Sequence, residues 1–351
     1  MPPLRHIQRE DDNKDGRDIK MNIAVDAMGG DNAPYVVVHG AIQACKELGI
    51  DITLVGDTEK ISTVLNGKEE AKNIRIHQCD EVVLMGESPL KAVRKKRDSS
   101  IRVAFDLLKK GDVDAVVSAG NSGATIASAI LTLGKMKGVE RPGLACMLPA
   151  DKGNVILIDV GGNVDCRPVH MLHFGIMADA FATSCLGMKR PKVGLLSIGQ
   201  EAGKGNEQVR QAYELLKDSP LNFAGNVEGR DIFSGEIPIV VCDGFVGNIV
   251  LKLSEGLAEA VTSRFKEDMT RSPAGRLLFL LGRRFFKKTE NSLDYAEYGG
   301  APILGIKGVG IVCHGSSSSK AIKNAIKLAV GNVENRVQEH MSLELEKIRK
   351  G

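Results

Sequence analysis

The residues best suited to chemistry in this sequence lie in short loops rich in glycine, asparagine, serine and aspartate. Each loop directly follows a short apolar run of the kind that forms a β-strand. These loops span residues 27–32, 119–123, 160–165, 198–206, 243–248 and 315–319. Such loops present backbone N–H groups and helix N-termini, which favour anions. Six of them in one chain predict a site for a phosphate group, with ordinary tight turns as the alternative.

Polar groups within these loops suggest separate roles. Backbone N–H groups, amides and hydroxyls can hold a phosphate, whereas a bare carboxylate would repel it. We therefore expect the aspartates to accept N–H bonds and fix the loops; they are Asp26, Asp31, Asp159 and Asp243. The expected phosphate cradle consists of Gly29, Gly30, Asn32, Gly120, Asn121 and Ser122. The later loops complete the predicted binding residues with Gly161, Asn163, Asn206 and Asn248.

Two basic side chains, Lys204 and His314, could supply charge or a proton in such a site. Lys204 is the one cation of its glycine-rich loop. A catalytic role and an ordinary surface position in a turn are equally good interpretations of this lysine. His314 ends a predicted strand, where a packed histidine is the simpler interpretation. With Asn121 they form the predicted catalytic group. No metal is expected, since the pair His170 and His173 has no carboxylate or cysteine cluster beside it.

Familiar nucleotide and nucleophile motifs are missing. No G-x-G-x-x-G follows the first predicted strand, so a dinucleotide fingerprint is absent. Residues 199–205 are similar to a Walker loop, but this loop is one residue short and lacks Ser or Thr after its Lys. No G-x-S-x-G nucleophile elbow occurs. Covalent catalysis therefore has no support, a bound anion could itself be the nucleophile, and we expect no cofactor.

Short apolar runs alternate with helical patterns from residue 21 onward. Strands are predicted at residues 22–26, 52–55, 73–78, 115–118, 155–159, 192–197, 237–242 and 309–314. Helices are predicted at residues 34–48, 100–110, 122–133, 169–186, 206–217, 248–268 and 316–340. This alternation predicts crossover connections and a mostly parallel sheet with helices on both faces. The loops would then meet at the carboxyl edge of the sheet.

Composition limits the class of protein. The net charge of +3 and the aromatic content of 4% argue against a nucleic-acid partner. Seven scattered cysteines without C-x-x-C predict reduced, mostly buried thiols in a cytosolic protein. Residues 1–20 are highly charged, so we expect a disordered extension rather than a signal peptide, with Met21 as an alternative start. The sequence contains no run of 18 apolar residues, so no membrane span is predicted.

Several sequence blocks, in one order, resemble the bacterial phosphate acyltransferases across residues 21–345. The first is Ile23-Ala-Val-Asp-Ala-Met-Gly-Gly-Asp-Asn-Ala-Pro34, and the others lie at residues 87–100, 117–124, 159–165, 225–229, 241–252 and 298–305. The chain departs from the usual family pattern at Ser122, Gly162, Ser197 and Gln200. The hydroxyl at position 122 survives, whereas the carboxylate common at position 200 is lost.

The resemblance implies transfer of a fatty acyl group from acyl carrier protein to inorganic phosphate, giving acyl phosphate for phosphatidic acid and phospholipid synthesis. It implies a Rossmann-like three-layer α/β fold, as in isopropylmalate dehydrogenases and phosphotransacetylases. One domain over residues 21–345 would carry a helical protrusion around 255–295. A cytoplasmic homodimer is implied, in contact with the inner face of the cell membrane, where a glycerol-3-phosphate acyltransferase would take the product.

Two surface segments fit these partners. A basic run before the predicted helix at 100–110 suits steering of a small acidic carrier protein, with a solvated helix end as the alternative; it comprises Lys91, Arg94, Lys95, Lys96 and Arg97. Residues 276–288 combine Arg and Lys with Leu and Phe, as in helices that lie on anionic membranes. Leu278, Leu281 and Phe285 would enter the membrane, with a dimer interface as the alternative.

Two other functions stay open from the sequence. One is a different enzyme on a similar scaffold, either a coenzyme A-dependent phosphotransacetylase or a dehydrogenase of the isopropylmalate type. Thioester profiling and a nicotinamide binding assay distinguish these. The other is a scaffold without catalysis that brings carrier protein to the membrane, which the intact glycine-rich loops disfavour.

Overall fold

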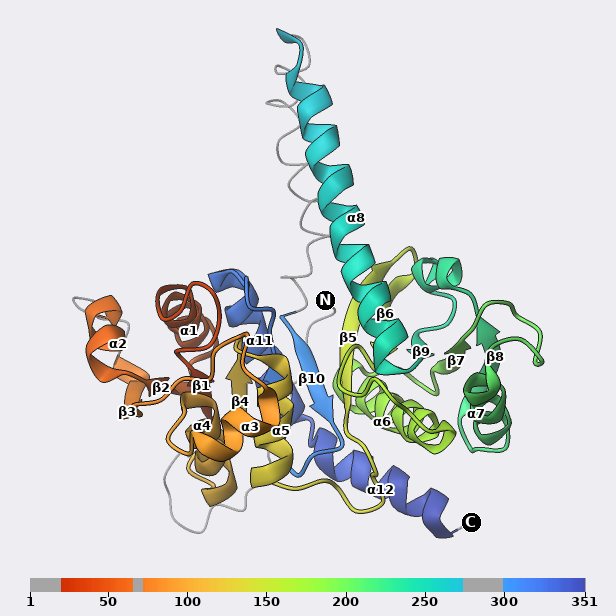
Figure 1. Ribbon diagram of the computed structural model, residues 1–351, viewed down its shortest axis with the longest axis horizontal. Helices are drawn as coiled ribbons and strands as arrows, with labels where there is room; N and C mark the ends of the chain where they lie inside the picture. The colour runs from red at the N-terminus through yellow and green to blue at the C-terminus, as the bar shows by residue number, and fades with distance from the viewer. Residues whose placement is uncertain (1–19, 66–71, 274–298, 351) are drawn as a thin grey trace.

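The computed structural model describes residues 20–65, 72–273 and 299–350 (Figure 1). The strands of these residues form one sheet in the order β3-β2-β1-β4-β11-β10-β5-β6-β9-β7-β8. Their bounds are β1 Asn22–Asp26, β2 Asp51–Gly56, β3 Ile74–Gln78, β4 Ala115–Ser118, β5 Gly143–Ala150, β6 Gly153–Ile158, β7 Lys192–Leu196, β8 Asn222–Val227, β9 Ile239–Val241, β10 Ala301–Leu304 and β11 Val309–Val312.

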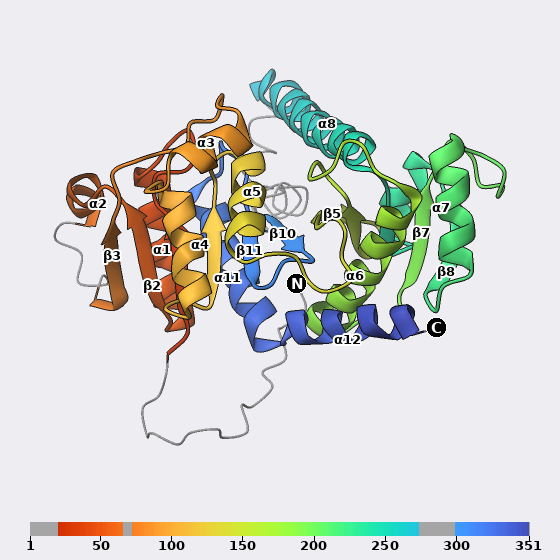
Figure 2. The same ribbon diagram turned by 60° about the horizontal axis from the view of Figure 1, so that its bottom comes forward.

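Helices cover both faces of this sheet. One hydrophobic cluster holds residues of α1, α6, α7, α11 and α12, and a second cluster on the opposite face holds residues of α3, α4 and α5. The helices are α1 Tyr35–Leu48, α2 Thr58–Leu65, α3 Pro89–Lys95, α4 Ser100–Lys110, α5 Ser122–Thr132, α6 Pro168–Leu186, α7 Glu207–Lys217, α8 Gly244–Thr270, α11 Ser319–Glu334 and α12 Val337–Lys350, with a 3-10 turn η2 at Gly229–Ser234. Figure 2 shows α12 lying along the base of the molecule, where it packs on α6.

The sheet is mostly parallel, as predicted, but three consecutive strand pairings in its middle are antiparallel. Strands β1, β2, β3, β4 and β11 are parallel to one another, and so are β6, β7, β8 and β9. Between the two groups, β10 pairs antiparallel with β11 and β5, and β5 pairs antiparallel with β6. The two groups therefore run in opposite directions. The prediction that all the loops share one carboxyl edge is wrong for this reason.

Most predicted elements are present, and the exceptions have local causes. The strands β1 and β4 and the helix α4 have the predicted bounds. The sequence pattern does not predict the strands β5, β8 and β10 or the short helices α2 and α3. Pro149 in β5 and Pro302 in β10 weaken the strand pattern, and β8 contains Gly225 and two asparagines, residue types that are rare in strands. The predicted helix at 316–340 is two helices, since Arg336 between them adopts a φ of 48°.

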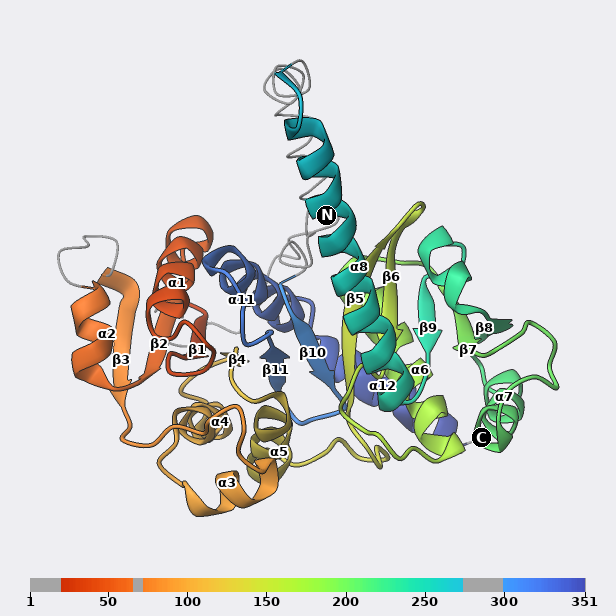
Figure 3. The ribbon, with the colours of Figure 1, turned by 45° about the horizontal axis from the view of Figure 1, so that its top comes forward.

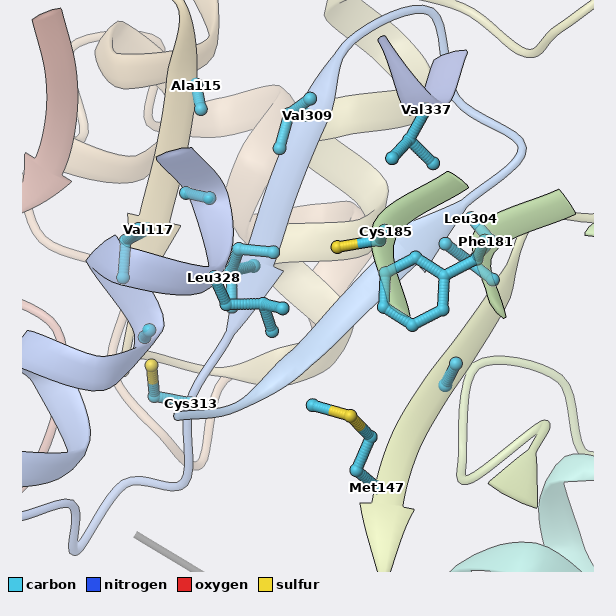
Figure 4. Packing of buried hydrophobic residues seen from close by; sticks show 14 of the residues in the cluster. Ala115, Val117, Met147, Phe181, Cys185, Leu304, Val309, Cys313, Leu328 and Val337 are labelled. Carbon is cyan, nitrogen blue, oxygen red and sulfur yellow. The ribbon is translucent and has the colours of Figure 1, made fainter. Parts of the chain in front are cut away.

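One hydrophobic core joins the two groups of strands. Figure 4 shows Val117 of β4, Leu304 of β10, Met147 of β5 and Phe181 of α6 in the same cluster. No break in this core separates the first group of strands from the second within the described residues. The shared core therefore supports our proposal of a single domain over residues 21–345.

The cysteines behave as the sequence predicts. Six of the seven are buried and all are free thiols. Cys185 and Cys313 lie in the core of Figure 4, and burial raises the pKa of each to about 12. A thiol held this far from ionisation is a weak nucleophile at neutral pH.

Helix α6 is the one helix of the described residues that is long and apolar enough to cross a membrane. Within the 18-residue window of α6 that meets this criterion, 61% of the helix is buried inside the structure. It packs against α7 and α12 and lies on β9. Its apolar composition is accounted for by this central position in the core.

Helix α8 extends away from the rest of the molecule, as Figures 1 and 3 show. It supplies the described part of the helical protrusion predicted at 255–295. The proposed membrane residues Leu278, Leu281 and Phe285 lie outside the described residues. Residues 1–19 of the predicted N-terminal extension lie outside them as well.

Candidate active site

A cavity of about 930 Å³ opens beside α8, between the two groups of strands. It is lined by Ser122 after β4, Gly161 after β6, Asn248 after β9 and His314 after β11. The predicted convergence of loops therefore holds for these four, although their strands run in two directions. A sheet this wide accumulates a large twist, which lets strand ends from both groups face one cavity.

The cavity combines polar loop ends with an apolar wall. The apolar lining comes chiefly from β5 and α8 and includes Leu144, Cys146, Leu148, Val160, Phe233, Leu251 and Ala258. The polar lining includes Ser122, Asn248, Lys252, Glu255 and His314. Such a site can hold a long apolar group with a polar or charged group beside it.

Asp26 fixes the end of β1 on one side of the cavity. Its carboxylate accepts the hydroxyl of Ser118 at 2.7 Å and the backbone N–H of Met28 at 3.2 Å. Asp26 is only 3% exposed, and this burial raises its pKa. The hydrogen bonds partly offset the cost of burying the carboxylate and join the ends of β1 and β4.

Glycines let the first loop approach its neighbours closely. A Cβ atom on Gly29 would lie 2.7 Å from the backbone nitrogen of Gly120 and 2.6 Å from Oδ2 of Asp26. Asp31 donates its backbone N–H to the carbonyl of Gly315 at 2.8 Å. The predicted cradle loops after β1 and β4 thus touch each other and the loop after β11. Asn32 lies at the exposed start of α1, where its carbonyl accepts the N–H of Val36.

Asp159 plays the corresponding part on the other side of the cavity. It is fully buried, which raises its pKa. Its Oδ1 accepts the backbone N–H groups of Leu144 and Gly162, at 2.9 and 3.0 Å. Its Oδ2 accepts the side-chain amide of Asn163 at 2.8 Å, and that amide also reaches the carbonyl of Pro142. Asp159 therefore ties the loop after β6 to the start of β5.

Three of the predicted binding residues are helix caps. Asn121 accepts the N–H of Ala124 at α5, Asn206 caps α7, and Asp243 caps α8. The amide nitrogen of Asn121 lies 2.9 Å from the carbonyl of Met85 and 3.2 Å from that of Glu87. Because the amide donates to these carbonyls, Asn121 holds the loop before α3 against the start of α5.

His314 presents a defined tautomer to the cavity. The backbone N–H of Ser316 donates to its Nδ1 at 3.2 Å, and the Ser316 hydroxyl lies 2.7 Å from the same nitrogen. A backbone N–H can only donate, so this contact favours the neutral ring with its proton on Nε2. Burial raises the pKa of Glu255, which lines the same cavity.

The predicted catalytic residue Lys204 does not line this cavity. Its loop follows β7, and the neighbouring Glu201 carbonyl accepts the side-chain amide of Asn226 at 2.8 Å. Asn206 starts α7 from the same loop. The structure brings Ser122 and Gly161 to this cavity but leaves Lys204 outside it. Of the predicted phosphate cradle, Ser122 alone lines the cavity, whereas Gly29, Gly30, Asn32, Gly120 and Asn121 do not.

Sequence reasoning missed two charged residues of α8, Lys252 and Glu255, that line the cavity. The sequence predicts α8 from residue 248, whereas the cap at Asp243 starts it at Gly244. Asn248, Lys252 and Glu255 are spaced by four and three residues, so they share one helix face. That spacing, combined with the predicted site residue Asn248, is the signal that could have found them.

Replacing Gly29 by alanine tests the close approach of the loops. We expect Gly29→Ala to lower the free energy of unfolding by about 2 kcal/mol, because its methyl group would overlap backbone atoms of Gly120. Urea unfolding measures this change. Gly86→Ala is the matched control, since a Cβ there meets nothing within 4 Å. Equal stability of the two variants would contradict the close contact.

Comparison with known proteins places these features in a family. The model described as "Fatty acid synthesis protein" matches residues 21–340. A phosphate acyltransferase of Geotalea daltonii is 52% identical over 323 residues, covering 92% of this chain and 93% of that protein. A phosphate acyltransferase of Geobacter sulfurreducens is 51% identical over 327 residues, covering 93% and 94%.

Solved structures share the fold at low sequence identity. A phosphotransacetylase from Streptococcus pyogenes has a TM-score of 0.61 at 18% identity, covering 90% of this chain and 94% of its own. A branched-chain phosphotransacylase from Enterococcus faecalis has a TM-score of 0.55 at 15% identity, covering 89% and 99%. These likenesses confirm the predicted Rossmann-like α/β fold. The family match and the close relatives, each spanning most of the chain, show that it belongs to the phosphate acyltransferase family.

Proposed function

We propose that this acyltransferase moves a fatty acyl group from acyl carrier protein to inorganic phosphate and releases acyl phosphate for phospholipid synthesis. The observation that carries the proposal is the cavity beside α8, where polar loop ends meet an apolar wall. The apolar wall suits the fatty chain, and the loop ends suit the phosphate and the thioester carbonyl.

In the proposed reaction, a phosphate oxygen attacks the carbonyl carbon of the thioester. The new carbon–oxygen bond replaces the carbon–sulfur bond, and the thiolate leaves with a proton. Phosphate is partly dianionic near neutral pH, so the attack needs no strong protein base. The site has to align the two substrates and stabilise the oxyanion.

Within this scheme, we assign His314 and Asn248 as catalytic residues. The Nε2 proton of His314 can stabilise the oxyanion or protonate the leaving thiolate. Asn248 lines the cavity, and its carboxamide lies within 3.7 Å of the position of a Cβ on Gly161. Asn121 is assigned a positioning role, because its amide is used by backbone carbonyls. Lys204 is the weaker catalytic candidate, since it does not line the cavity.

Substitution of His314 tests this assignment. We expect His314→Gln to lower kcat for acyl phosphate formation about 100-fold, because a neutral amide cannot donate a proton to the thiolate. Steady-state kinetics with acyl carrier protein thioester and phosphate measure this. His77→Gln, at an exposed position on β3, is the matched control and should keep the parental rate. Unchanged turnover in His314→Gln would remove this residue from the mechanism.

The basic run around α3 is our proposed docking surface for acyl carrier protein. Lys91, Arg94, Lys95 and Arg97 are exposed there. Lys96 differs, because it pairs with Glu87 at 2.6 Å and donates to the carbonyl of Val82. The exposed apolar side chains Leu84, Met85 and Leu90 lie beside this run in sequence. Asn121 connects the same loop to the cavity wall.

Charge reversal at Arg94 and Arg97 tests the docking surface. We expect the double variant to weaken carrier-protein binding at least tenfold at low salt, with a smaller difference at high salt because salt screens exposed charges. Surface plasmon resonance at two salt concentrations measures both. Reversal of Lys109 and Lys110, an exposed basic pair at the end of α4, is the matched control. Parental affinity in the Arg94 and Arg97 variant would rule out this surface.

We propose a homodimer that uses the outer face of α8. Five exposed apolar residues recur every four positions along it: Phe245, Ile249, Leu253, Leu257 and Val261. Leu253 is 68% exposed and Leu257 is 61% exposed. Leu253 and Leu257, in the middle of this stripe, lie on the opposite side of the helix from the cavity-lining Asn248 and Glu255. A second copy of α8 would bury this apolar stripe.

Glutamate at Leu253 and Leu257 tests the dimer. We expect the double variant to run as a monomer of 37.7 kDa in light scattering, while the parent runs at twice that mass. A buried pair of carboxylates would cost more than the apolar contact provides. Leu343→Glu, an exposed leucine on α12, is the control that should stay dimeric. A dimeric double variant would exclude α8 as the interface.

We further propose that the enzyme works in the cytoplasm at the inner face of the cell membrane. The support is the basic and apolar sequence of residues 276–288, with Leu278, Leu281 and Phe285 as membrane contacts. An acyl phosphate is too apolar to diffuse freely through water. Release at the membrane would pass it to a membrane glycerol-3-phosphate acyltransferase.

A further inference from the structure

A second cavity, of about 520 Å³, lies at the N-terminus of α6. The segment that links α5 to β5 forms its other side. The lining residues are Ile130, Lys135, Glu140, Arg141, Pro142, Arg167 and His170, and none of them lines the active-site cavity. Three of these side chains carry a positive charge and one carries a negative charge. The cavity is therefore positive, and the mechanism above does not use it.

Glu140 organises most of these groups. Its carboxylate pairs with the guanidinium of Arg167, and the same oxygen lies 3.1 Å from Nε2 of His170. Its backbone carbonyl accepts the ammonium of Lys135 at 2.8 Å. The backbone N–H of Arg167 donates to Nδ1 of His170 at 3.0 Å, which favours a neutral ring with its proton directed at Glu140. These contacts hold three cavity residues in place.

Arg141 takes no part in this network. It lines the cavity, yet it makes no hydrogen bond or ion pair with any of the described residues. Burial lowers the pKa of His170, and the nearby charges of Arg167, Arg141 and Lys135 lower it further. The three positive charges therefore all act on the His170 ring, which lines the same cavity. Helix α6 adds the positive end of its dipole, with no acidic residue in its first turn.

We propose that this cavity is a second anion site, which binds the phosphate group of a ligand through Arg141 with Lys135 beside it. A guanidinium fork matches two phosphate oxygens, and the Arg167 pair neutralises the one carboxylate that would repel them. Two sources carry this chemistry. One is free inorganic phosphate, and the other is the phosphate of a pantetheine arm. The anion site itself rests on the cavity, whereas its assignment to the pantetheine arm rests on the proposed function.

Isothermal titration at constant ionic strength tests this site without turnover. The probes are inorganic phosphate, 4′-phosphopantetheine and, as the control ligand, pantetheine without phosphate. Arg141→Ala is the test variant, because Arg141 has no internal partner whose loss would disturb folding. Lys137→Ala is the matched control, since it removes the same charge from the same segment but does not line the cavity.

We expect Arg141→Ala to bind at least one phosphorylated probe about tenfold more weakly, as the loss of a charge-assisted hydrogen bond implies. Lys137→Ala should bind both phosphorylated probes with the affinity of the parent. Weaker 4′-phosphopantetheine binding with unchanged pantetheine binding identifies the arm as the source. Loss of one of two inorganic phosphate sites identifies the free anion. Parental binding of both phosphorylated probes by Arg141→Ala would overturn the proposal.

Discussion

Two buried carboxylates, one in each group of strands, hold the site together. Asp26 accepts hydrogen bonds at the end of β1, and Asp159 does so at the end of β6. A carboxyl group without partners would be costly at either place, so each is stable only when the neighbouring strand or loop supplies its N–H or O–H donors. Each aspartate therefore fixes the strand end beside it. The cavity-lining loops after β4 and β6 start from strand ends that Asp26, through Ser118, and Asp159 fix.

The reversal of the sheet makes this constraint necessary. The two groups of strands run in opposite directions, so one continuous parallel ladder cannot align their ends. The hairpin of β5 and β6 joins them, and Asp159 ties the end of β6 back to Leu144 on β5. Close backbone contacts complete the wall, since a Cβ on Gly247 would lie 1.9 Å from the carbonyl oxygen of Asp159. The apolar wall of the cavity is the face of β5 that this arrangement exposes to α8.

Much of this architecture could be predicted from the sequence. Alternating apolar runs and helical patterns predict β1, β4 and α4 with correct bounds, because their strand and helix signals agree with their final surroundings. The glycine-rich loops indicate where the site lies, since glycine and polar residues after a strand serve both turns and ligands. The sequence blocks that resemble phosphate acyltransferases point to the family.

The remaining features depend on contacts that no local pattern contains. Proline in β5 and β10 hides both strands, so the reversal of the sheet could not be seen. Asn121 has the residue type of a phosphate ligand, but its amide is used by carbonyls 34 and 36 residues away. Lys204 has the right charge but follows β7, whose loop does not line the cavity. Tertiary position, rather than residue type, distinguishes these residues from His314 and Asn248.

We propose that the cavity beside α8 aligns phosphate with a carrier-bound thioester for direct attack. The most direct test is to incubate the purified protein with palmitoyl carrier protein and 18O-labelled phosphate, and to record the mass of the product. We expect palmitoyl phosphate that keeps every labelled oxygen, because only the carbon–sulfur bond breaks. Free palmitate as the sole product, without acyl phosphate, would contradict it.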